Sequence, residues 1–230
     1  MSTSPLPLLP ALLLVLGGYL LGSIPTAYLA SRWLNKGDIR RYGSGTVSGS
    51  MVWEHVARWA IVPVGLFDVG KAALPAWLGV HWGLGQPAAA AAGLAAVAGH
   101  NWPLFLGFVG GRGLGCFLGV LLALFPWGFP WMLGFLALGW RLGDSAPWAL
   151  VGIASLPVLA HLVGGPAVVA PLSGAMLLLT LAKRLEANRR PLPAPGPERR
   201  QVILRRLLLD RDIASHVDWI RRSPQDGTPA

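Results

Sequence analysis

The sequence predicts an all-helical, polytopic integral membrane protein. Three observations support this class: hydrophobic residues make up 53% of the 230 residues, charged residues make up only 13%, and the mean hydropathy is +0.54. Soluble domains carry roughly a quarter charged residues, which cover their surface. The composition therefore excludes a disordered chain and a soluble nucleic-acid binder. The single cysteine excludes a secreted domain stapled by disulfides.

Seven apolar stretches predict the membrane helices. A bilayer core of ~30 Å needs about 20 apolar residues in a helix, and the first three stretches are long enough. The fourth and fifth are short, so a single span bent at the prolines of 126–130 is the alternative, and it would give six spans. The stretches are 6–31, 57–79, 87–109, 114–126, 127–142, 147–164 and 166–183.

The first stretch is interpreted as a retained helix and not as a signal peptide. It has no basic residues before it, its apolar run is too long, and Arg32 and Lys36 follow it. Eighteen of the 19 basic residues lie on one side of the seven predicted spans, and only Lys71 lies within a span. Because cytoplasmic loops are enriched in Lys and Arg, we expect an external N-terminus and a cytoplasmic C-terminus.

Residues 1–190 are expected to form the membrane domain, and residues 191–230 a separate cytoplasmic tail. Four of the residues 191–197 are proline, which predicts a stiff linker. An amphipathic helix is expected at 198–222, in a region with 11 basic and six acidic residues between 183 and 230. Such a helix either lies on the anionic lipids of the inner leaflet or packs on the protein's own loops.

Two glycine-rich loops on the predicted cytoplasmic side are candidate anion sites. In residues 37–50, Arg40 and Arg41 precede a run of glycines and hydroxyl residues that includes Ser44. In residues 99–113, Arg112 lies between glycines. Glycines allow backbone N–H groups to converge on phosphate oxygens, and arginine binds phosphate with two donors. The alternatives are a flexible connecting loop in the first case and close helix packing in the second.

Asp68 and Lys71 form a third polar cluster, within the second predicted span. Their i,i+3 spacing places them on one helix face, where they can pair. Ionisable groups at membrane depth are costly and often mark function, but a pair that neutralises itself and only packs is the alternative. No metal-ligand cluster and no Ser-His-acid set is visible in the sequence. What the three clusters share is anion chemistry.

In order and spacing, these motifs resemble the PlsY family of bacterial acyl-phosphate:glycerol-3-phosphate acyltransferases. The resemblance covers about residues 20–190. The matching segments are 22–25 (Gly-Ser-Ile-Pro), 38–45, 68–71 (Asp-Val-Gly-Lys), 99–108 and 110–113 (Gly-Gly-Arg-Gly).

The resemblance implies transfer of a fatty acyl group from acyl phosphate to the 1-hydroxyl of glycerol-3-phosphate, giving lysophosphatidic acid for phospholipid synthesis. It implies seven membrane helices in the bacterial plasma membrane, with the active site on the cytoplasmic side. No metal or nucleotide cofactor is expected, because acyl phosphate is already an activated donor. It leaves the oligomeric state open.

The same resemblance suggests which residues act in the site. Ser44, Arg112 and His100 are the expected catalytic residues, with His100 orienting the loop. Asn188 is expected to hold substrate. The expected phosphate-binding set is Arg40, Ser44, Lys71, Gly110, Gly111, Arg112, Gly113 and Asn188.

The chain departs from the family pattern at several positions. The two asparagines of the first motif are absent, the lysine of the second motif is Arg112, and the threonine that follows is Cys116. The histidine position of the third motif falls on Leu185. Two alternatives to a working enzyme therefore stay open: an impaired homologue that binds acyl phosphate or anionic lipid, and a small transporter.

Overall fold

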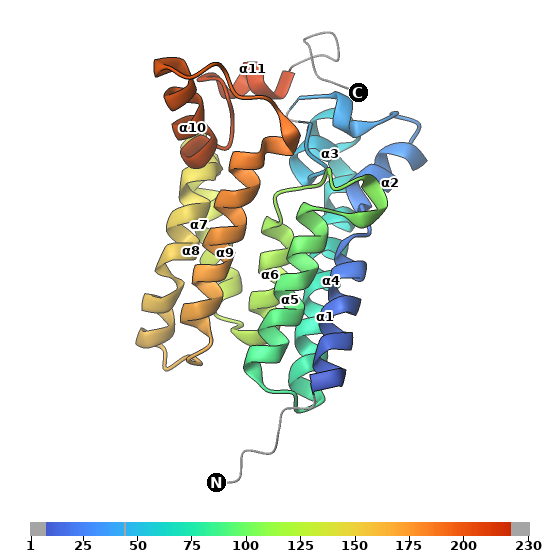
Figure 1. Cartoon of the computed structure of the whole chain (residues 1–230), viewed down its shortest axis with the longest axis vertical. Coiled ribbons are helices and arrows are strands. Elements are labelled where there is room, and N and C mark those ends of the chain that lie inside the picture. The colour runs from blue at the N-terminus through green and yellow to red at the C-terminus, as the bar shows by residue number, and fades with distance from the viewer. Residues whose placement is uncertain (1–7, 44, 222–230) are drawn as a thin grey trace.

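A computed structural model describes residues 8–43 and 45–221, which form helices and connecting loops without a strand (Figure 1). The all-helical class is thus confirmed. Helices lie at all seven predicted apolar stretches and run along the long axis of the molecule. They are α1 (Leu8–Gly22), α4 (Ile61–His81), α5 (Gln86–Asn101), α6 (Leu114–Leu124), α7 (Gly128–Arg141), α8 (Ser145–Leu162) and α9 (Val169–Glu186).

Three helical stretches are long and apolar enough to cross a membrane by length and composition: Leu8–Trp33, Arg58–His81 and Ser145–Leu162. Helix α6 is also apolar but has 11 residues, so it is about 17 Å long at 1.5 Å per residue. The number of membrane crossings therefore stays a prediction.

The helical structure is interrupted at two prolines, although the apolar sequence pattern continues through both. The first predicted stretch is two helices, α1 and α2 (Thr26–Trp33), because Pro25 has no N–H and disfavours a helical residue before it. Residues 114–142 do not form one bent helix: α6 and α7 are separate elements that turn at Pro126 and pack against each other.

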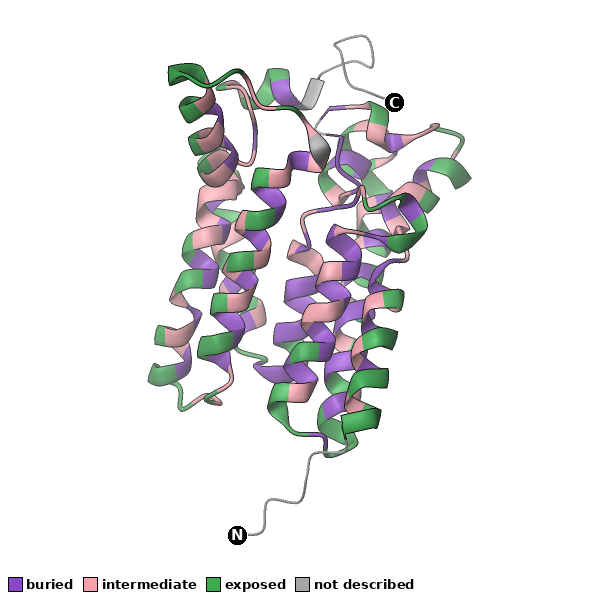
Figure 2. Cartoon of the chain, in the orientation of Figure 1, coloured by how far each residue is buried: buried purple, intermediate pink, exposed green. Residues whose placement is uncertain are grey.

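The bundle has two groups of helices. In Figure 1, α1, α4, α5 and α6 form one group and α7, α8 and α9 form the other. Helices α5 and α6 lie between neighbours and have nine and seven buried residues (Figure 2). The largest buried side chains of this core are Phe117, Leu121, Phe125, Met132, Ile153, Leu156 and Met176.

Small residues allow α1 and α5 to approach closely. Gly18 and Gly22 face the backbone of Ala92 and Ala96, so each helix offers small residues four apart. This is the small-xxx-small pattern by which membrane helices pack through van der Waals contact.

Replacing Gly22 with alanine is expected to destabilise the fold by about 1–3 kcal/mol, because the new Cβ would collide with the Ala96 carbonyl oxygen. Gly17→Ala is the matched control in the same helix, since no atom lies within 4 Å of a Cβ there. Thermal unfolding of both variants in detergent measures the difference. Equal unfolding temperatures would contradict the close α1–α5 contact.

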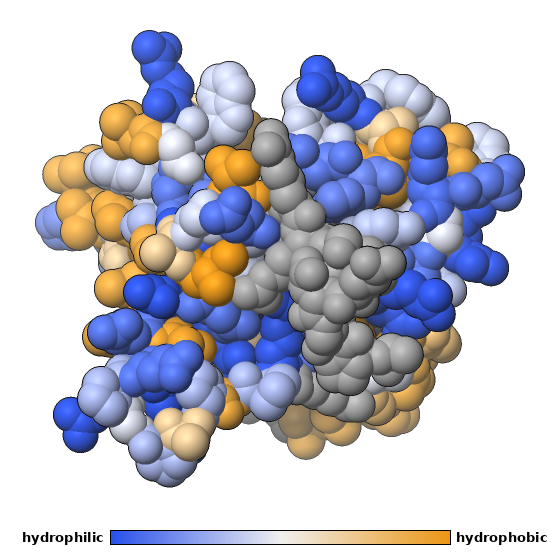
Figure 3. Space-filling model, turned by 90° about the horizontal axis from the view of Figure 1, so that it is seen from above, coloured by the Kyte–Doolittle hydropathy of each residue, from blue (hydrophilic) through white to orange (hydrophobic). Residues whose placement is uncertain are grey.

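One end of the bundle carries the polar segments. Here lie α2, the short helix η1 (Ile39–Arg41), α3 (Gly49–His55) and the helical turn η2 (Arg58–Ala60). A small core that includes Ile39, Val47, Met51 and Val52 holds these loops in place. Seen from above, hydrophilic side chains gather at this end (Figure 3). It corresponds to the face predicted to be cytoplasmic.

The tail helix is shorter than predicted. In place of one helix at 198–222, the tail forms α10 (Pro197–Leu209) and α11 (His216–Arg221). The chain turns at Asp210, whose φ of 56° is left-handed and ends α10. Helix α10 packs against α8 and α9, with Val202 and Arg206 buried. The tail helix thus packs on the protein itself, and its contact with anionic lipids stays a prediction.

Candidate functional site

The glycine loop of residues 110–113 joins the end of α5 to the start of α6. A short turn, η3 (Leu104–Leu106), precedes it, and Gly113 has a left-handed φ of 76°. A Cβ at Gly110 would lie 2.6 Å from the Asn101 carbonyl oxygen, and one at Gly111 would lie 2.6 Å from the Val47 carbonyl oxygen. Glycine is therefore required here because other backbone segments come very close.

Three segments that are far apart in the sequence meet at this loop. The Val47 N–H donates to the Gly110 carbonyl at 3.2 Å. The Asn188 Nδ2 donates to the Gly45 and Gly110 carbonyls at 2.9 and 3.3 Å. We call this convergence of residues 43, 45–48, 110–113 and 188–190 the glycine site. It brings together Arg112 and Asn188, two residues expected from the sequence to bind substrate.

Asn188 reaches the glycine site through an unusual turn after α9. Ala187 and Asn188 both have left-handed backbones, with φ of 46° and 53°, which returns the chain across the end of the bundle. Non-glycine residues in this region cost free energy and often lie at functional sites. The Asn188 Oδ1 atom is buried and accepts no hydrogen bond from the residues that the structure describes. Its capacity to accept a hydrogen bond is therefore unused within the described residues.

Arg112 lies at the junction of the glycine site, α9 and the tail. Its Nε donates to Asp210 Oδ2 at 2.9 Å, and its Nη1 donates to the Lys183 carbonyl at 3.2 Å. Lys183 is itself buried, with Nζ 2.8 Å from Glu186 Oε2 and 5.2 Å from the centre of the Trp102 ring.

Arg190 contributes a further guanidinium to the glycine site, and its Nη1 lies 3.9 Å from Asp212 Oδ2. Its Nη2 donates to the Gly43 carbonyl at 2.9 Å, and its guanidinium lies 4.5 Å from the centre of the Trp219 ring. The glycine site thus holds two arginines, a buried amide and hydroxyl groups. The Thr46 and Ser48 hydroxyls lie 2.9 Å apart.

Asp68, Lys71, Thr26 and His100 form a buried ion cluster under the glycine site. Asp68 Oδ1 lies 2.7 Å from Lys71 Nζ, 2.6 Å from Thr26 Oγ1 and 3.5 Å from His100 Nδ1. Lys71 Nζ also donates to the Ile24 carbonyl at 3.0 Å. The sequence-based expectation that Asp68 and Lys71 pair is thus confirmed. The Lys71 charge is neutralised within the protein, and its phosphate-binding role stays a prediction.

The ligand atoms of Asp68, His100 and Cys116 lie within 4.8 Å of one another, a grouping that can hold a metal ion in some proteins. Here Lys71 already supplies a positive charge against the Asp68 carboxylate. A second cation would be repelled at that distance, so the geometry favours an ion pair.

His100 connects the ion cluster to the glycine site. Its imidazole faces Asp68 on one side and Gly111 on the other, and its carbonyl accepts from the Gly111 N–H at 3.1 Å. The expected role of His100 in orienting the loop stays a prediction. Because the Gly111 N–H is used in this way, donors to phosphate are more readily supplied by the first turn of α6, whose N–H groups have no partner within the helix.

Arg40 is occupied by a neighbouring acid. Its Nε and Nη2 donate to both oxygens of Asp38, and its guanidinium lies over the Tyr28 ring. Burial acts to raise the pKa of Asp38, but hydrogen bonds from Arg40 and the charges of Arg40 and Arg41 outweigh it and hold that pKa below 3.8. The hydrogen bonds that Arg40 donates to Asp38 in turn raise the pKa of Arg40. The phosphate-binding role of Arg40 stays a prediction.

Two positions of the expected site need separate mention. Ser44 lies outside the described residues. Leu185, at the position of the family's histidine, is 41% exposed. The sequence does not single out Lys183 or Arg190, because basic residues after an apolar span are typical of a topology signal. It does not single out Asp210 either, because Asp210 lies in a tail that carries charges of both signs.

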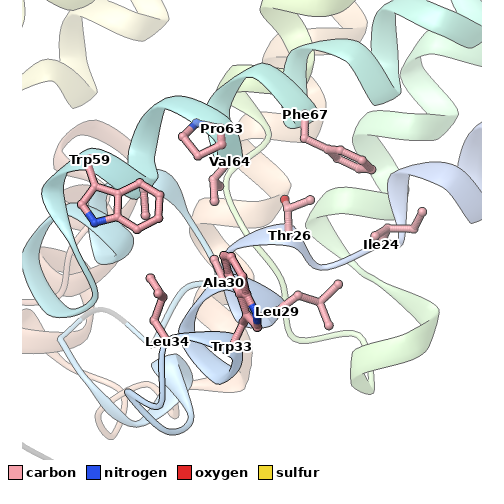
Figure 4. Close-up of a pocket in the computed structure, with 11 residues that line it drawn as sticks. Ile24, Thr26, Leu29, Ala30, Trp33, Leu34, Trp59, Pro63, Val64 and Phe67 are labelled. Atoms are coloured by element: carbon pink, nitrogen blue, oxygen red, sulfur yellow. The ribbon is translucent and has the colours of Figure 1, made fainter.

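An apolar groove lies between α2 and α4, close to the ion cluster (Figure 4). Its volume is about 290 Å³. Thr26 lines this groove and donates to Asp68, so it connects the groove to the ion cluster. Its other lining residues are Ile24, Leu29, Ala30, Trp33, Leu34, Trp59, Ala60, Pro63, Val64 and Phe67.

Comparison with known proteins gives consistent matches. A family model described as glycerol-3-phosphate acyltransferase matches residues 12–192. Glycerol-3-phosphate acyltransferase 5 of Dehalococcoides mccartyi is 36% identical, over 95% of this chain and 97% of the relative. A glycerol-3-phosphate acyltransferase of Synechococcus is 37% identical, over 83% of this chain and 96% of the relative.

Two solved structures have the same fold. Both are crystal structures of PlsY (YgiH), described as an integral membrane glycerol 3-phosphate acyltransferase, and each aligns with 79% of this chain and 91% of its own. The lysophosphatidic acid form has a TM-score of 0.67 at 29% identity, and the glycerol 3-phosphate form 0.66 at 30%. The family match ends at residue 192, before α10 begins.

Proposed function

The chain belongs to the glycerol-3-phosphate acyltransferase family, and on this premise we propose that it is an integral membrane enzyme which acylates the 1-hydroxyl of glycerol-3-phosphate. The proposed acyl donor is acyl phosphate, and the product is lysophosphatidic acid for phospholipid synthesis. The proposed location is the bacterial plasma membrane, with the glycine site on the cytoplasmic side. The observation that carries the proposal is the convergence of Arg112, Arg190 and Asn188 at the glycine site, where Arg190 donates to the Gly43 carbonyl and Asn188 to the Gly110 carbonyl.

The reaction requires two anions to meet at one membrane face. The glycerol hydroxyl oxygen attacks the acyl carbon, a new ester C–O bond forms, and the C–O bond to phosphate breaks. The hydroxyl proton ends on the released phosphate. Such a transfer needs positioned substrates and donors for the charge on the transition state, and it needs no cofactor.

We assign roles to the site residues on this basis. Arg112 and the first turn of α6 bind a phosphoryl group, because charged donors and helix N-termini both favour phosphate. The free Asn188 Oδ1 accepts a hydrogen bond from a glycerol hydroxyl. The ion cluster supports the glycine loop through His100. Arg40, Ser44 and Lys71 are further candidates from the family resemblance.

The groove between α2 and α4 is the proposed site of the acyl chain. It is lined almost entirely by apolar side chains (Figure 4), and Thr26, which lies among them, donates to Asp68 of the ion cluster that supports the glycine loop. The acyl phosphate end of a chain in this groove would point to the polar end of the bundle, where the glycine site lies.

Replacing Ala30 with phenylalanine is expected to lower transfer of a stearoyl group about tenfold more than transfer of a lauroyl group, because the added ring fills the groove. The assay compares rates with stearoyl and lauroyl phosphate at saturating glycerol-3-phosphate. Leu66→Phe is the matched control, since Leu66 is 68% exposed on α4 and does not line the groove. An equal effect of Ala30→Phe on both chain lengths would contradict the assignment.

A second candidate function is a non-catalytic homologue that binds acyl phosphate or anionic lipid. The observation that favours it is the exposed Leu185 in place of the family's histidine. Complementation of a conditional acyltransferase mutant distinguishes the two. We expect the wild-type gene to restore growth and Arg112→Ala to fail at equal expression. Binding of acyl phosphate without any rescue would favour the second candidate.

A further inference from the structure

The C-terminal segment of residues 197–221 is firmly attached to the polar end of the bundle. Arg184 of α9 donates to the Leu207 and Leu208 carbonyls and also to the Ala146 carbonyl. In the tail, the buried Arg206 donates to the carbonyls of Leu185 and Arg190. Side chains of this kind, buried and donating to several backbone oxygens, are costly to pull apart.

Two further contacts attach the turn after α10. Arg211 pairs with Asp144, the residue that caps the start of α8, and Arg206 pairs with Asp212. The turn at 210–215 is therefore held from both sides. It is part of the folded structure and is not a loosely attached extension.

Because the segment is attached in this way, Asp210 lies next to Arg112. Asp210 ends α10 with a left-handed backbone and donates its N–H to the Arg206 carbonyl. Its Oδ2 accepts from Arg112 Nε, across 98 residues of sequence. The Lys183 carbonyl accepts from Nη1 of the same guanidinium. Two acceptors fixed on different elements define the plane and direction of the guanidinium.

We infer that Asp210 is a positioning residue for Arg112, so that the C-terminal segment completes the site from beyond residues 12–192, which the family model matches. The inference rests on the proposed function. A guanidinium has five N–H donors, and the two contacts use Nε and one hydrogen of Nη1, so donors remain for phosphate. Because the Arg112 guanidinium is already held in place before substrate binds, binding costs less side-chain conformational entropy than it would for a mobile arginine.

The opposite reading is an acidic plug that competes with phosphate for Arg112. A plug must leave for substrate to enter. Leaving would break the contacts of Arg184, Arg206 and Arg211 together, which the firm attachment of the segment opposes. The positioning role is therefore the one that the contacts favour.

Steady-state kinetics of the full-length purified protein test the inference. We expect Asp210→Ala to lower kcat/KM for glycerol-3-phosphate about 10- to 100-fold, as misplacement of a substrate-binding group does, and Asp210→Asn to lower it less. The control is Asp218→Asn, an exposed acid on α11, which should match wild type. Thermal unfolding of each variant verifies folding.

A double-mutant cycle separates positioning from a general structural role. If Asp210 acts through Arg112, Arg112→Ala with Asp210→Ala should be no slower than Arg112→Ala alone. If the loss of kcat/KM in the double variant equalled the product of the two single losses, the inference would be overturned. Wild-type activity of Asp210→Ala would also overturn it, and increased activity would indicate a plug. An inactive wild type would instead refute the proposed function, and the inference with it.

Discussion

Replacing Arg112 with alanine is expected to lower the rate of acyl transfer by about 10²–10³-fold. The reason is that Arg112 is the charged donor of the glycine loop, held by Asp210 and the Lys183 carbonyl next to the start of α6. Removing one donor to a charged transition state typically costs this much. The measurement is the initial rate of lysophosphatidic acid formation by the purified variant.

Two further variants, Arg112→Lys and Arg40→Ala, test whether the guanidinium geometry of Arg112 matters and whether Arg112 matters more than Arg40. Lysine keeps the charge but lacks the planar fork, so Arg112→Lys should be intermediate between wild type and alanine. Arg40 is engaged by both oxygens of Asp38, so Arg40→Ala should have a smaller effect than Arg112→Ala. If Arg40→Ala proved the more damaging, the phosphate site would have to be moved to the loop of residues 37–50.

Replacing Asp68 with asparagine is expected to destabilise the protein by about 3–5 kcal/mol. Asp68 and Lys71 are both buried, and Asp68 Oδ1 is the partner of Lys71, Thr26 and His100 at once. The substitution would leave the Lys71 ammonium as an uncompensated buried charge. Thermal and denaturant unfolding in a fixed detergent would show the loss.

The double variant Asp68→Asn with Lys71→Met is the control for this prediction. It removes both charges, and replacing a whole buried pair by uncharged groups is often close to neutral. We therefore expect the double variant to recover most of the lost stability. A double variant less stable than Asp68→Asn alone would show that Lys71 contributes in some other way.

The membrane helices could be predicted well, because their signal is local. Runs of apolar residues located all seven bundle helices, and the i,i+3 spacing of Asp68 and Lys71 predicted their ion pair. The breaks were less predictable, since the apolar pattern continues through Pro25. In the tail, the polar residues from Asp210 onward also fit a helical pattern, and only the left-handed Asp210 shows that the helix ends there.

The candidate site could be predicted only in part, because its contacts are long-range. Gly110 and Arg112 stand out in the sequence as a glycine loop with a cation. Nothing local indicates that Asn188 reaches Gly45 across 143 residues, or that Asp210 reaches Arg112. Lys183 follows an apolar span and therefore resembles a topology signal, although it is fully buried against Trp102 and Glu186.

We claim that this chain is itself an acyltransferase. The most direct test is incubation of the purified, full-length protein with radiolabelled acyl phosphate and glycerol-3-phosphate, followed by separation of lipid and phosphate products. We predict lysophosphatidic acid and inorganic phosphate in equal amounts, with no added metal or nucleotide. Absence of both products, while a conventional family member is active in the same assay, would contradict the claim.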